Sequence, residues 1–279
     1  MKTSRVYGCV FSLLVMLGWV AGARGEEANP ADRVATGAIV EGFGTYGRSL
    51  VSAMMALTDQ MLAQELRTLA VLAQTPAVRS GAWEKMHEAL KSSQGDRPLG
   101  IIWFAKPDGS YFTGEAGGTE QNLSDRPYFP ALMAGQSVPG VLVISKSTGK
   151  KSVVVAVPVK EGDKVIGALG TSLFLDRFSQ RVEQALALPP SMVFYCLNPD
   201  GPVILHRDAR YIFEDPRRLN SESLRIAAEK MLADEAVDVH YEFAGYQRRV
   251  VCRASPVTHW RFAVGINTGV VANPPGPDQ

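Results

Sequence analysis

Apolar residues recur at steps of three and four between Asp32 and about Ala73, which is the spacing of one helix face. Leucine and methionine make up this stripe, at Leu50, Met54, Leu57, Met61, Leu62, Leu66, Leu69 and Leu72. The stripe predicts a long N-terminal helix packed against the rest of the chain, with a dimer seam as the second interpretation. Four glycines between positions 37 and 47 lower helix propensity, so we expect fraying or a break there.

The hydrophobic period changes near residue 99, where short runs typical of β-strands begin. The expected order is two strands joined by the turn Pro107-Asp108-Gly109-Ser110, then a helix, then a meander of three strands. We expect the strands at residues 99–104, 111–113, 141–145, 152–159 and 165–175, and the helix at residues 125–134 with Ser124 or Asp125 as its N-cap.

The same order of elements then repeats. A connecting helix is expected at residues 176–188, a helix capped by Ser221 at 221–232, and strands at 193–197, 203–206, 237–243, 248–255 and 260–266. Such an internal repeat implies two similar modules in one chain. The sequence therefore predicts an α+β fold, in which a long N-terminal helix precedes two modules. Each module is expected to be a five-stranded antiparallel sheet with helices on one face, enclosing a pocket between the two.

The N-terminus has the pattern of a secretory signal peptide. Lys2 and Arg5 precede an uncharged apolar run over residues 6–23, which ends in the small residues that a signal peptidase reads. We expect cleavage of residues 1–25 and a periplasmic protein; the alternative is an inner-membrane anchor, because the run approaches the length that spans a bilayer. The rest divides into a helical region at 26–98, a first module at 99–176, a second at 177–270 and a disordered tail at 271–279.

Composition and side-chain chemistry exclude several functions. The 279 residues are 46% hydrophobic, with a net charge of +1 and no basic stripe, so we expect no nucleic-acid partner. The four histidines lack metal-ligand spacing, and the sequence contains no nucleophile elbow and no phosphate-binding glycine loop. We therefore predict a protein that is not an enzyme and needs no metal or cofactor. His206-Arg207-Asp208 is interpreted as a solvated strand end, since adjacent strand residues point to opposite faces.

Cys196 and Cys252 are the two cysteines outside the predicted signal peptide. Export permits a disulfide, but we expect the two residues on the first and fourth strands of the second sheet, with the fifth strand between them. Two strand steps of about 4.8 Å place them about 9–10 Å apart, and a disulfide needs Cα atoms within about 7 Å. We therefore expect two buried free thiols.

Residues 123–129 form the segment with the clearest binding chemistry. Arg126 stands next to Tyr128 and Phe129, and a planar guanidinium beside rings that exclude water suits a small anion or carboxylate. From these residues alone, a structural arginine paired with Asp125 is an equal alternative.

A series of motifs in one order resembles the Cache family, the extracytoplasmic sensor domains of bacterial chemoreceptors and histidine kinases. The motifs are Pro-Asp-Gly at 107–109, Leu-Ser-Asp-Arg-Pro-Tyr-Phe at 123–129, Ile-Ser-Lys-Ser-Thr-Gly-Lys at 144–150, Val-Ala-Val-Pro-Val at 155–159 and Val-Ile-Gly-Ala-Leu-Gly at 165–170. With the long helix and the second module, residues 32–268 resemble the double Cache form. The resemblance implies two PAS-like modules, with a ligand pocket in the first between the sheet and the loop-helix segment.

The resemblance also implies which residues bind the ligand. Family members that sense amino acids have an Arg-x-Trp-Tyr motif, in which Arg126 matches the arginine while Tyr128 and Phe129 replace the two aromatic residues. Ser172 stands where such members have an Asp that holds the ammonium, so a small organic carboxylate is favoured over an amino acid. The further candidates for the pocket lining are Trp103, Tyr111, Ser145, Lys146 and Ser147. Lys146 ranks below Ser145, because strand alternation points it to the opposite face.

Family members usually continue through a transmembrane helix into a signalling domain, and none follows in this sequence. We therefore expect an exported sensor or binding protein for a small organic ligand, acting without a signalling domain of its own. A membrane sensor kinase or chemoreceptor is the protein partner that the resemblance implies. The alternative is a periplasmic interaction module whose pocket is vestigial and which regulates a membrane-bound partner.

Overall fold

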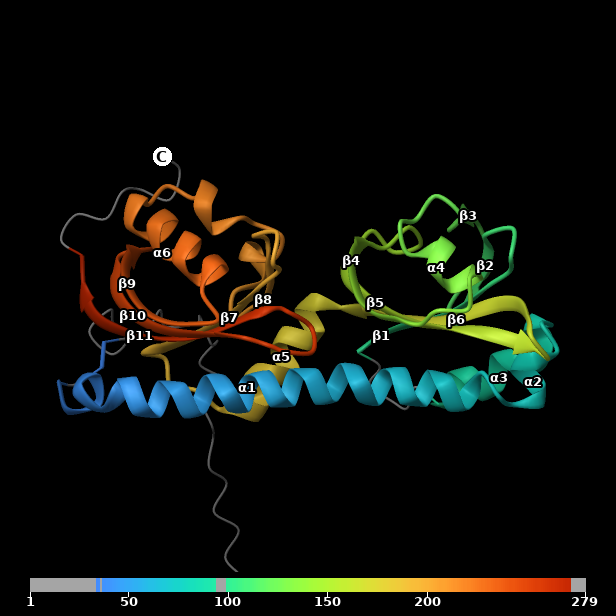
Figure 1. Cartoon of the computed structure of the whole chain (residues 1–279), viewed down its shortest axis with the longest axis horizontal. Coiled ribbons are helices and arrows are strands. Elements are labelled where there is room, and N and C mark those ends of the chain that lie inside the picture. The colour runs from blue at the N-terminus through green and yellow to red at the C-terminus, as the bar shows by residue number, and fades with distance from the viewer. Residues whose placement is uncertain (1–33, 36, 94–98, 272–279) are drawn as a thin grey trace, which may run out of the picture.

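The computed structural model describes residues 34–35, 37–93 and 99–271 of the chain (Figure 1). The predicted signal peptide and nearly all of the predicted tail lie outside these residues, as do positions 32, 33 and 36 of the expected long helix. Val34 and Ala35 are described and are not helical, so the helix begins later than predicted. None of the helices in the described ranges is long and apolar enough to cross a membrane.

Helix α1 (Gly37–Leu72) is continuous, so the break expected at its glycines does not occur. Gly44 and Gly47 are buried against the second sheet. A Cβ atom on Gly44 would lie 2.8 Å from Arg249 Nη2, and one on Gly47 would lie 3.1 Å from Val251 Cγ2. Close packing on the sheet therefore offsets the poor helix propensity of these residues. Two shorter helices follow, α2 (Pro76–Arg79) and α3 (Trp83–Ser93).

The first sheet is antiparallel and has six strands, one more than the sequence predicts. The strands are β1 (Gly100–Ala105), β2 (Ser110–Thr113), β3 (Gly117–Asn122), β4 (Val138–Ile144), β5 (Lys151–Glu161) and β6 (Lys164–Phe174), in the order β3-β2-β1-β6-β5-β4. The missed strand, β3, is a mostly exposed edge strand of sequence Gly-Gly-Thr-Glu-Gln-Asn. It lacks the apolar alternation from which a strand is predicted.

The second sheet has the five antiparallel strands that the sequence predicts. They are β7 (Met192–Leu197), β8 (Val203–His206), β9 (Ala236–Phe243), β10 (Tyr246–Ala254) and β11 (Arg261–Val270), in the order β8-β7-β11-β10-β9. Helix α5 (Leu175–Leu186) connects the sheets, and the 3-10 turns η2 (Ala209–Tyr211) and η3 (Pro216–Arg218) precede α6 (Glu222–Ala233). Ser221 caps α6 as predicted, since its Oγ accepts from the Leu224 N–H at 3.2 Å.

Alternate residues of each strand face two different cores. In β1, Ile102 and Phe104 join the core shared with α1, whereas Trp103 and Ala105 join the core under helix α4 (Phe129–Met133). The second sheet alternates in the same way between α1 and α6. Figure 1 shows the result: α1 runs along one face of both sheets, and α4 and α6 lie over the opposite faces. The predicted α+β fold with two PAS-like modules is confirmed.

Side chains join α1 and the two sheets to one another. Asp59 of α1 accepts hydrogen bonds from Ser255 Oγ at 2.7 Å and from Thr258 Oγ1 at 3.3 Å, in the turn between β10 and β11. Lys151, the first residue of β5, donates to the Ile212 carbonyl of the second module. These contacts hold the modules in one arrangement along a single helix.

Cys196 and Cys252 lie on opposite faces of the second sheet. Cys196 pairs with Phe262 and Cys252 with Ala263, which are consecutive residues of β11 and therefore point in opposite directions. Both are buried free thiols, one in the core under α1 and the other in the core under α6. The predicted arrangement, with the last strand between the two cysteine strands, is confirmed.

Candidate ligand-binding site

Eight of the nine residues that the sequence predicts for a ligand site line one cavity in the first module. They are Trp103, Tyr111, Arg126, Tyr128, Ser145, Lys146, Ser147 and Ser172. Leu123 and Val143 complete the lining and were not predicted. Leu123 stands in the motif at residues 123–129 and could have been found from it, whereas Val143 differs in no visible way from other apolar strand residues.

Arg126 is held in a series of tight turns at the wall of this cavity. Its N–H donates to the Leu123 carbonyl at 2.9 Å, and its own carbonyl accepts from the Phe129 N–H at 2.9 Å. The guanidinium Nη2 donates to the Ile144 carbonyl at 2.6 Å. Nε is buried and has no hydrogen-bond partner within the described part of the chain. A buried charged donor without a partner can receive an anionic group.

The turn after β4 decides where Lys146 points. The strand alternation expected for residues 145–147, which pointed Lys146 away from Ser145 and Ser147, is wrong. β4 ends at Ile144, and the chain then turns, with the Gly149 N–H donating to the Ser145 carbonyl at 2.8 Å. In a turn the side chains do not alternate, and all three line the same cavity.

Asp125 is paired with Lys146 and not with Arg126. Lys146 Nζ lies 2.6 Å from Asp125 Oδ1 and also donates to the Asn122 carbonyl at 2.6 Å. The hydrogen bond from Lys146 lowers the pKa of Asp125 below its usual value. Among the described residues, no hydrogen bond or ion pair joins Arg126 to Asp125. The charge of Arg126 is therefore available to a ligand.

Three buried aromatic side chains line the cavity. Trp103, Tyr111 and Tyr128 are each at most 6% exposed. The indole Nε1 of Trp103 donates to Ser172 Oγ at 3.2 Å, and the ring centroids of Trp103 and Tyr128 are 6.5 Å apart. Burial raises the pKa of Tyr128 to about 12, so its hydroxyl stays protonated and can donate. The site thus combines cations and hydroxyl donors with an aromatic wall.

Phe129 is the predicted site residue that does not line the cavity. It begins α4, four residues later than the sequence predicts, so neither Ser124 nor Asp125 is the N-cap of this helix. The Phe129 side chain is 4% exposed and packs in the same core as Leu132. Its place is below the site, where it supports the cavity wall.

The cavity at Arg126 is nearly filled by the side chains that line it. Its volume is about 10 Å³, which is room for roughly one water molecule. The contacts from Arg126 to Ile144 and from Lys146 to Asn122 join the two sides of its mouth. A ligand of several heavy atoms therefore needs the segment at 122–126 and the turn at 145–150 to separate.

In the second module, the space between the sheet and α6 is filled by side chains of the module itself. Tyr241 donates to the Tyr195 hydroxyl at 3.2 Å, and Tyr195 donates to Met231 Sδ at 3.4 Å. All three side chains are buried in the core under α6. The first module is therefore the one in which the described residues leave binding groups unoccupied.

The segment His206-Arg207-Asp208 is not the solvated strand end that the sequence predicts. Arg207 pairs with Glu183 at 2.6 Å and donates to three backbone carbonyls, those of Leu188, Pro189 and Met192. The His206 ring stacks on Tyr195 with centroids 6.1 Å apart, and its Nδ1 accepts from the Asp208 N–H at 2.8 Å. Burial lowers the pKa of His206 to about 4. The segment joins the α5–β7 connection to the second sheet.

Within residues 34–35, 37–93 and 99–271, no cluster of three His, Cys, Asp or Glu side chains could hold a metal ion.

Comparison with known proteins identifies the fold. No protein-family model matches the chain, and no curated protein matches it in sequence. The ligand-binding domain of the Pseudomonas aeruginosa amino acid chemoreceptor PctB, solved with L-Arg, superposes with a TM-score of 0.64 at 16% identity, over 81% of this chain and 96% of that one. The corresponding domain of the Pseudomonas fluorescens chemoreceptor CtaA, solved with L-serine, gives 0.64 at 15% identity, over 82% and 99%.

A third structure extends this likeness beyond chemoreceptors. The extracellular domain of rpHK1S-Z16, described as a histidine kinase, gives a TM-score of 0.66 at 15% identity, over 82% of this chain and 95% of that one. The fold is thus that of the ligand-binding sensor domains of chemoreceptors and histidine kinases. The double Cache resemblance that the motifs indicate is confirmed at the level of the fold. Function is argued from the site, because one fold hosts many functions.

Proposed function

We propose that this chain is an extracytoplasmic sensor or binding domain that takes a small organic carboxylate into the cavity at Arg126. The observation that carries the proposal is the Arg126 guanidinium, whose Nε is buried in the cavity wall without a partner among the described residues. A carboxylate is the group that a guanidinium binds with two parallel hydrogen bonds. The likeness in fold to sensor domains supports the same class of function.

We consider two classes of carboxylate ligand for this cavity, amino acids and organic acids. L-Arg and L-serine, bound to PctB and CtaA, carry an α-carboxylate beside an ammonium. An organic acid shares the carboxylate and lacks the ammonium. In this cavity Ser145 and Ser172 offer hydroxyls and no charge, and Asp125 already pairs with Lys146. The charges therefore favour an organic acid, with amino acids as the second class.

A thermal-shift screen of matched ligand pairs tests both the site and the class. The pairs are acetate with glycine, propionate with alanine, and glycerate with serine, which differ at the ammonium. Binding at 100 times the dissociation constant stabilises the folded state by about 2.7 kcal/mol, which is measurable as a higher melting temperature. We expect the acid of at least one pair to shift the melting temperature more than its amino acid. A shift from amino acids alone would overturn the ligand class and keep the site.

One observation favours a second function, that of an interaction module with a vestigial pocket that regulates a membrane-bound partner. The cavity volume of about 10 Å³ is what such a pocket would have. This function predicts that neither acids nor amino acids raise the melting temperature. It also predicts that Arg126→Ala destabilises the ligand-free protein, since the contact with Ile144 would then be structural.

We further propose that the protein acts in the periplasm, with residues 1–25 as a cleaved signal peptide and a membrane sensor kinase or chemoreceptor as its partner. The basic, apolar and small-residue pattern of the N-terminus supports export. Cell fractionation should yield a soluble form whose N-terminus begins between Arg24 and Glu26. Recovery of the chain only from the membrane, with Met1 intact, would instead identify the apolar run as an anchor.

A further inference from the structure

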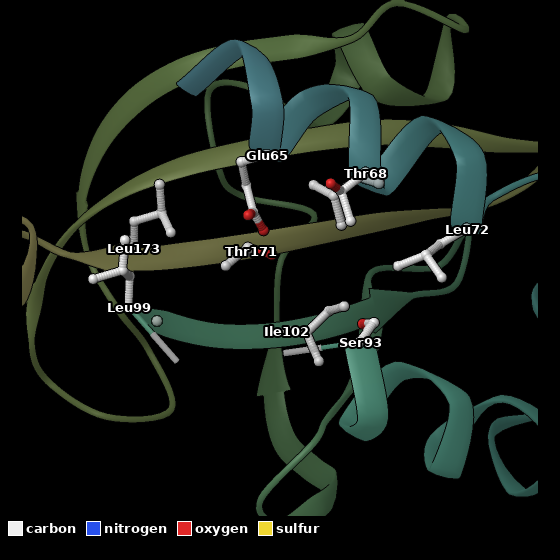
Figure 2. Close-up of a pocket in the computed structure, with 10 residues that line it drawn as sticks. Glu65, Thr68, Leu72, Ser93, Leu99, Ile102, Thr171 and Leu173 are labelled. Atoms are coloured by element: carbon white, nitrogen blue, oxygen red, sulfur yellow. The ribbon is translucent and has the colours of Figure 1, made fainter. Parts of the chain in front are cut away.

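A second cavity lies on the other face of the first sheet, between the sheet and α1 (Figure 2). Its volume is about 220 Å³, against about 10 Å³ for the cavity at Arg126. The apolar part of its wall comes from α1, β1 and β6, at Leu72, Ile102 and Leu173 among others. This volume is large enough to hold a small organic molecule as well as water.

Two polar groups in this cavity have no partner among the residues that the structure describes. Thr171 of β6 is 2% exposed, and its Oγ1 is buried without a hydrogen-bond partner in the described ranges. Figure 2 shows the carboxylate of Glu65 reaching from α1 toward Thr171. Glu65 is the charged side chain among the described residues of the lining, and none of the residues that the structure describes forms an ion pair or hydrogen bond with its carboxylate. An unpaired buried hydroxyl is destabilising, so the site favours a ligand that satisfies it.

The other hydroxyl groups of the lining are satisfied within the chain. Thr68 Oγ1 accepts from Gln64 Nε2 at 3.4 Å, and Ser93 Oγ donates to the Leu90 carbonyl at 2.7 Å. Within the described lining, a carboxylate and a hydroxyl oxygen remain for a ligand, beside apolar side chains. The carboxylate accepts hydrogen bonds, and the hydroxyl can accept as well as donate, so a single donating group can bind to both.

We propose that this cavity is a second ligand site, which binds a small primary alkylamine in its protonated form. The ammonium group has three N–H donors and can reach both the Glu65 carboxylate and the Thr171 hydroxyl, while the alkyl chain covers the leucine and isoleucine side chains. The negative charge of Glu65 disfavours an anion, so the ligand class is opposite to the one at Arg126. The proposal does not depend on the proposed function, because it rests on other residues and another face of the sheet.

The location of the site gives such a ligand a structural role. Glu65 belongs to α1 and Thr171 to β6, so one ammonium group would join the long helix to the first sheet. The packing between α1 and the sheet should therefore be more stable with the amine bound, and the melting temperature of the whole chain reports this.

Calorimetric titration and thermal shift with butylammonium chloride test the proposal on the whole chain, with sodium chloride at equal concentration as the ionic control. We expect butylammonium to raise the melting temperature and sodium chloride to leave it unchanged. Glu65→Gln keeps the size of the side chain and removes its charge, so the affinity for butylammonium should fall about tenfold or more. The matched control is Glu41→Gln, the same change at an exposed position of the same helix, which should bind like the wild type.

Thr171→Val separates binding from folding. Valine has the shape of threonine without the hydroxyl, so the melting temperature of the ligand-free protein should hold or rise, while the affinity for butylammonium falls about three- to tenfold. If Glu65→Gln does not fold, Glu65→Asp replaces it, since the shorter carboxylate keeps the charge and should bind more weakly. The proposal is overturned if butylammonium does not shift the wild type, or if it shifts the Glu65 variant equally. The cavity would then hold water alone.

Discussion

Thr171 and Ser172 are consecutive residues of β6, and their hydroxyls line cavities on opposite faces of the first sheet. Strand β1 repeats this relationship, since Ile102 lines the cavity under α1 and Trp103 the cavity at Arg126. The alternation of side chains along a strand therefore places the two cavities back to back. Strands β1 and β6 of this one sheet form the wall between the two cavities.

The two faces should respond to separate substitutions. Ser172→Ala removes a hydroxyl from the cavity at Arg126 and should weaken the binding of an organic acid several-fold, while butylammonium binding stays within about twofold. Thr171→Val should do the reverse. Isothermal titration of both ligands into both variants measures the four affinities. Equal losses of both ligands in either variant would show that the substitution disturbs the sheet and not one site.

Arg126 should matter for binding and little for folding. Arg126→Lys keeps the charge and loses the planar fork, so affinity for an organic acid should fall. Arg126→Ala should cost on the order of 2–5 kcal/mol of binding free energy, because the ligand charge is left unpaired. The melting temperature of the ligand-free variants should stay near that of the wild type. Arg218→Ala, at an 86% exposed side chain of the second module, is the control and should change neither quantity.

Gly170 should tolerate no side chain, because the Trp103 ring lies over it. A Cβ atom on Gly170 would lie 2.3 Å from Trp103 Cζ2. Gly170→Ala should therefore displace the ring from Ser172 and destabilise the fold by about 1–3 kcal/mol, measured by denaturant unfolding and tryptophan fluorescence. Gly42→Ala, at an open position of α1, should instead stabilise the protein by up to about 1 kcal/mol. A Gly170→Ala variant as stable as the wild type would place the Trp103 ring elsewhere.

His206 should make the stability of the protein depend on pH. Burial lowers its pKa from 6.5 to about 4, and its Nδ1 accepts the Asp208 N–H, which requires the neutral ring. Between these two values the unfolded chain binds more protons than the folded one. The contribution of His206 to the free energy of unfolding is therefore present above pH 6.5. It is lost as the pH falls toward 4, by about 3 kcal/mol at most. Denaturant unfolding at a series of pH values should show a weaker acid dependence for His206→Asn, whereas the exposed control His240→Asn should follow the wild type.

Cys196 and Cys252 should react with a thiol reagent only after unfolding. Burial raises the pKa of Cys252 to about 12 and also raises that of Cys196, so neither is a thiolate at neutral pH. Denaturant without reductant should release two reactive thiols from a chain that begins after residue 25, and three from a chain that retains Cys9. If neither thiol reacts in a chain that begins after residue 25, the two cysteines form a disulfide, which would contradict the sheet order.

The sequence by itself determined the architecture and most of the residues that line the cavity at Arg126. Periodicity changes at residues 72–99 and 176–193 located the helices and the two modules, because a helix and a half-buried strand need different spacings of apolar residues. The motif at 123–129 and the resemblance to Cache domains together predicted Arg126 and Tyr128 as cavity residues, and both line the cavity. The N-cap at Ser221 was predicted from the local preference of helix starts for serine. The separation of Cys196 and Cys252 was predicted from the order of the strands.

Only the tertiary structure decided what depends on contacts between distant segments. The glycines of α1 stay helical because Gly44 and Gly47 meet the second sheet about 200 residues further along the chain, a compensation that local propensity does not contain. The direction of the Lys146 side chain depends on where β4 ends. Strand β3 has no apolar pattern from which the strand could be predicted. The cavity beside Glu65 likewise exists because α1 crosses one face of β1 and β6 without filling it. Such gaps are set by the fit of packed surfaces, which a one-dimensional pattern does not encode.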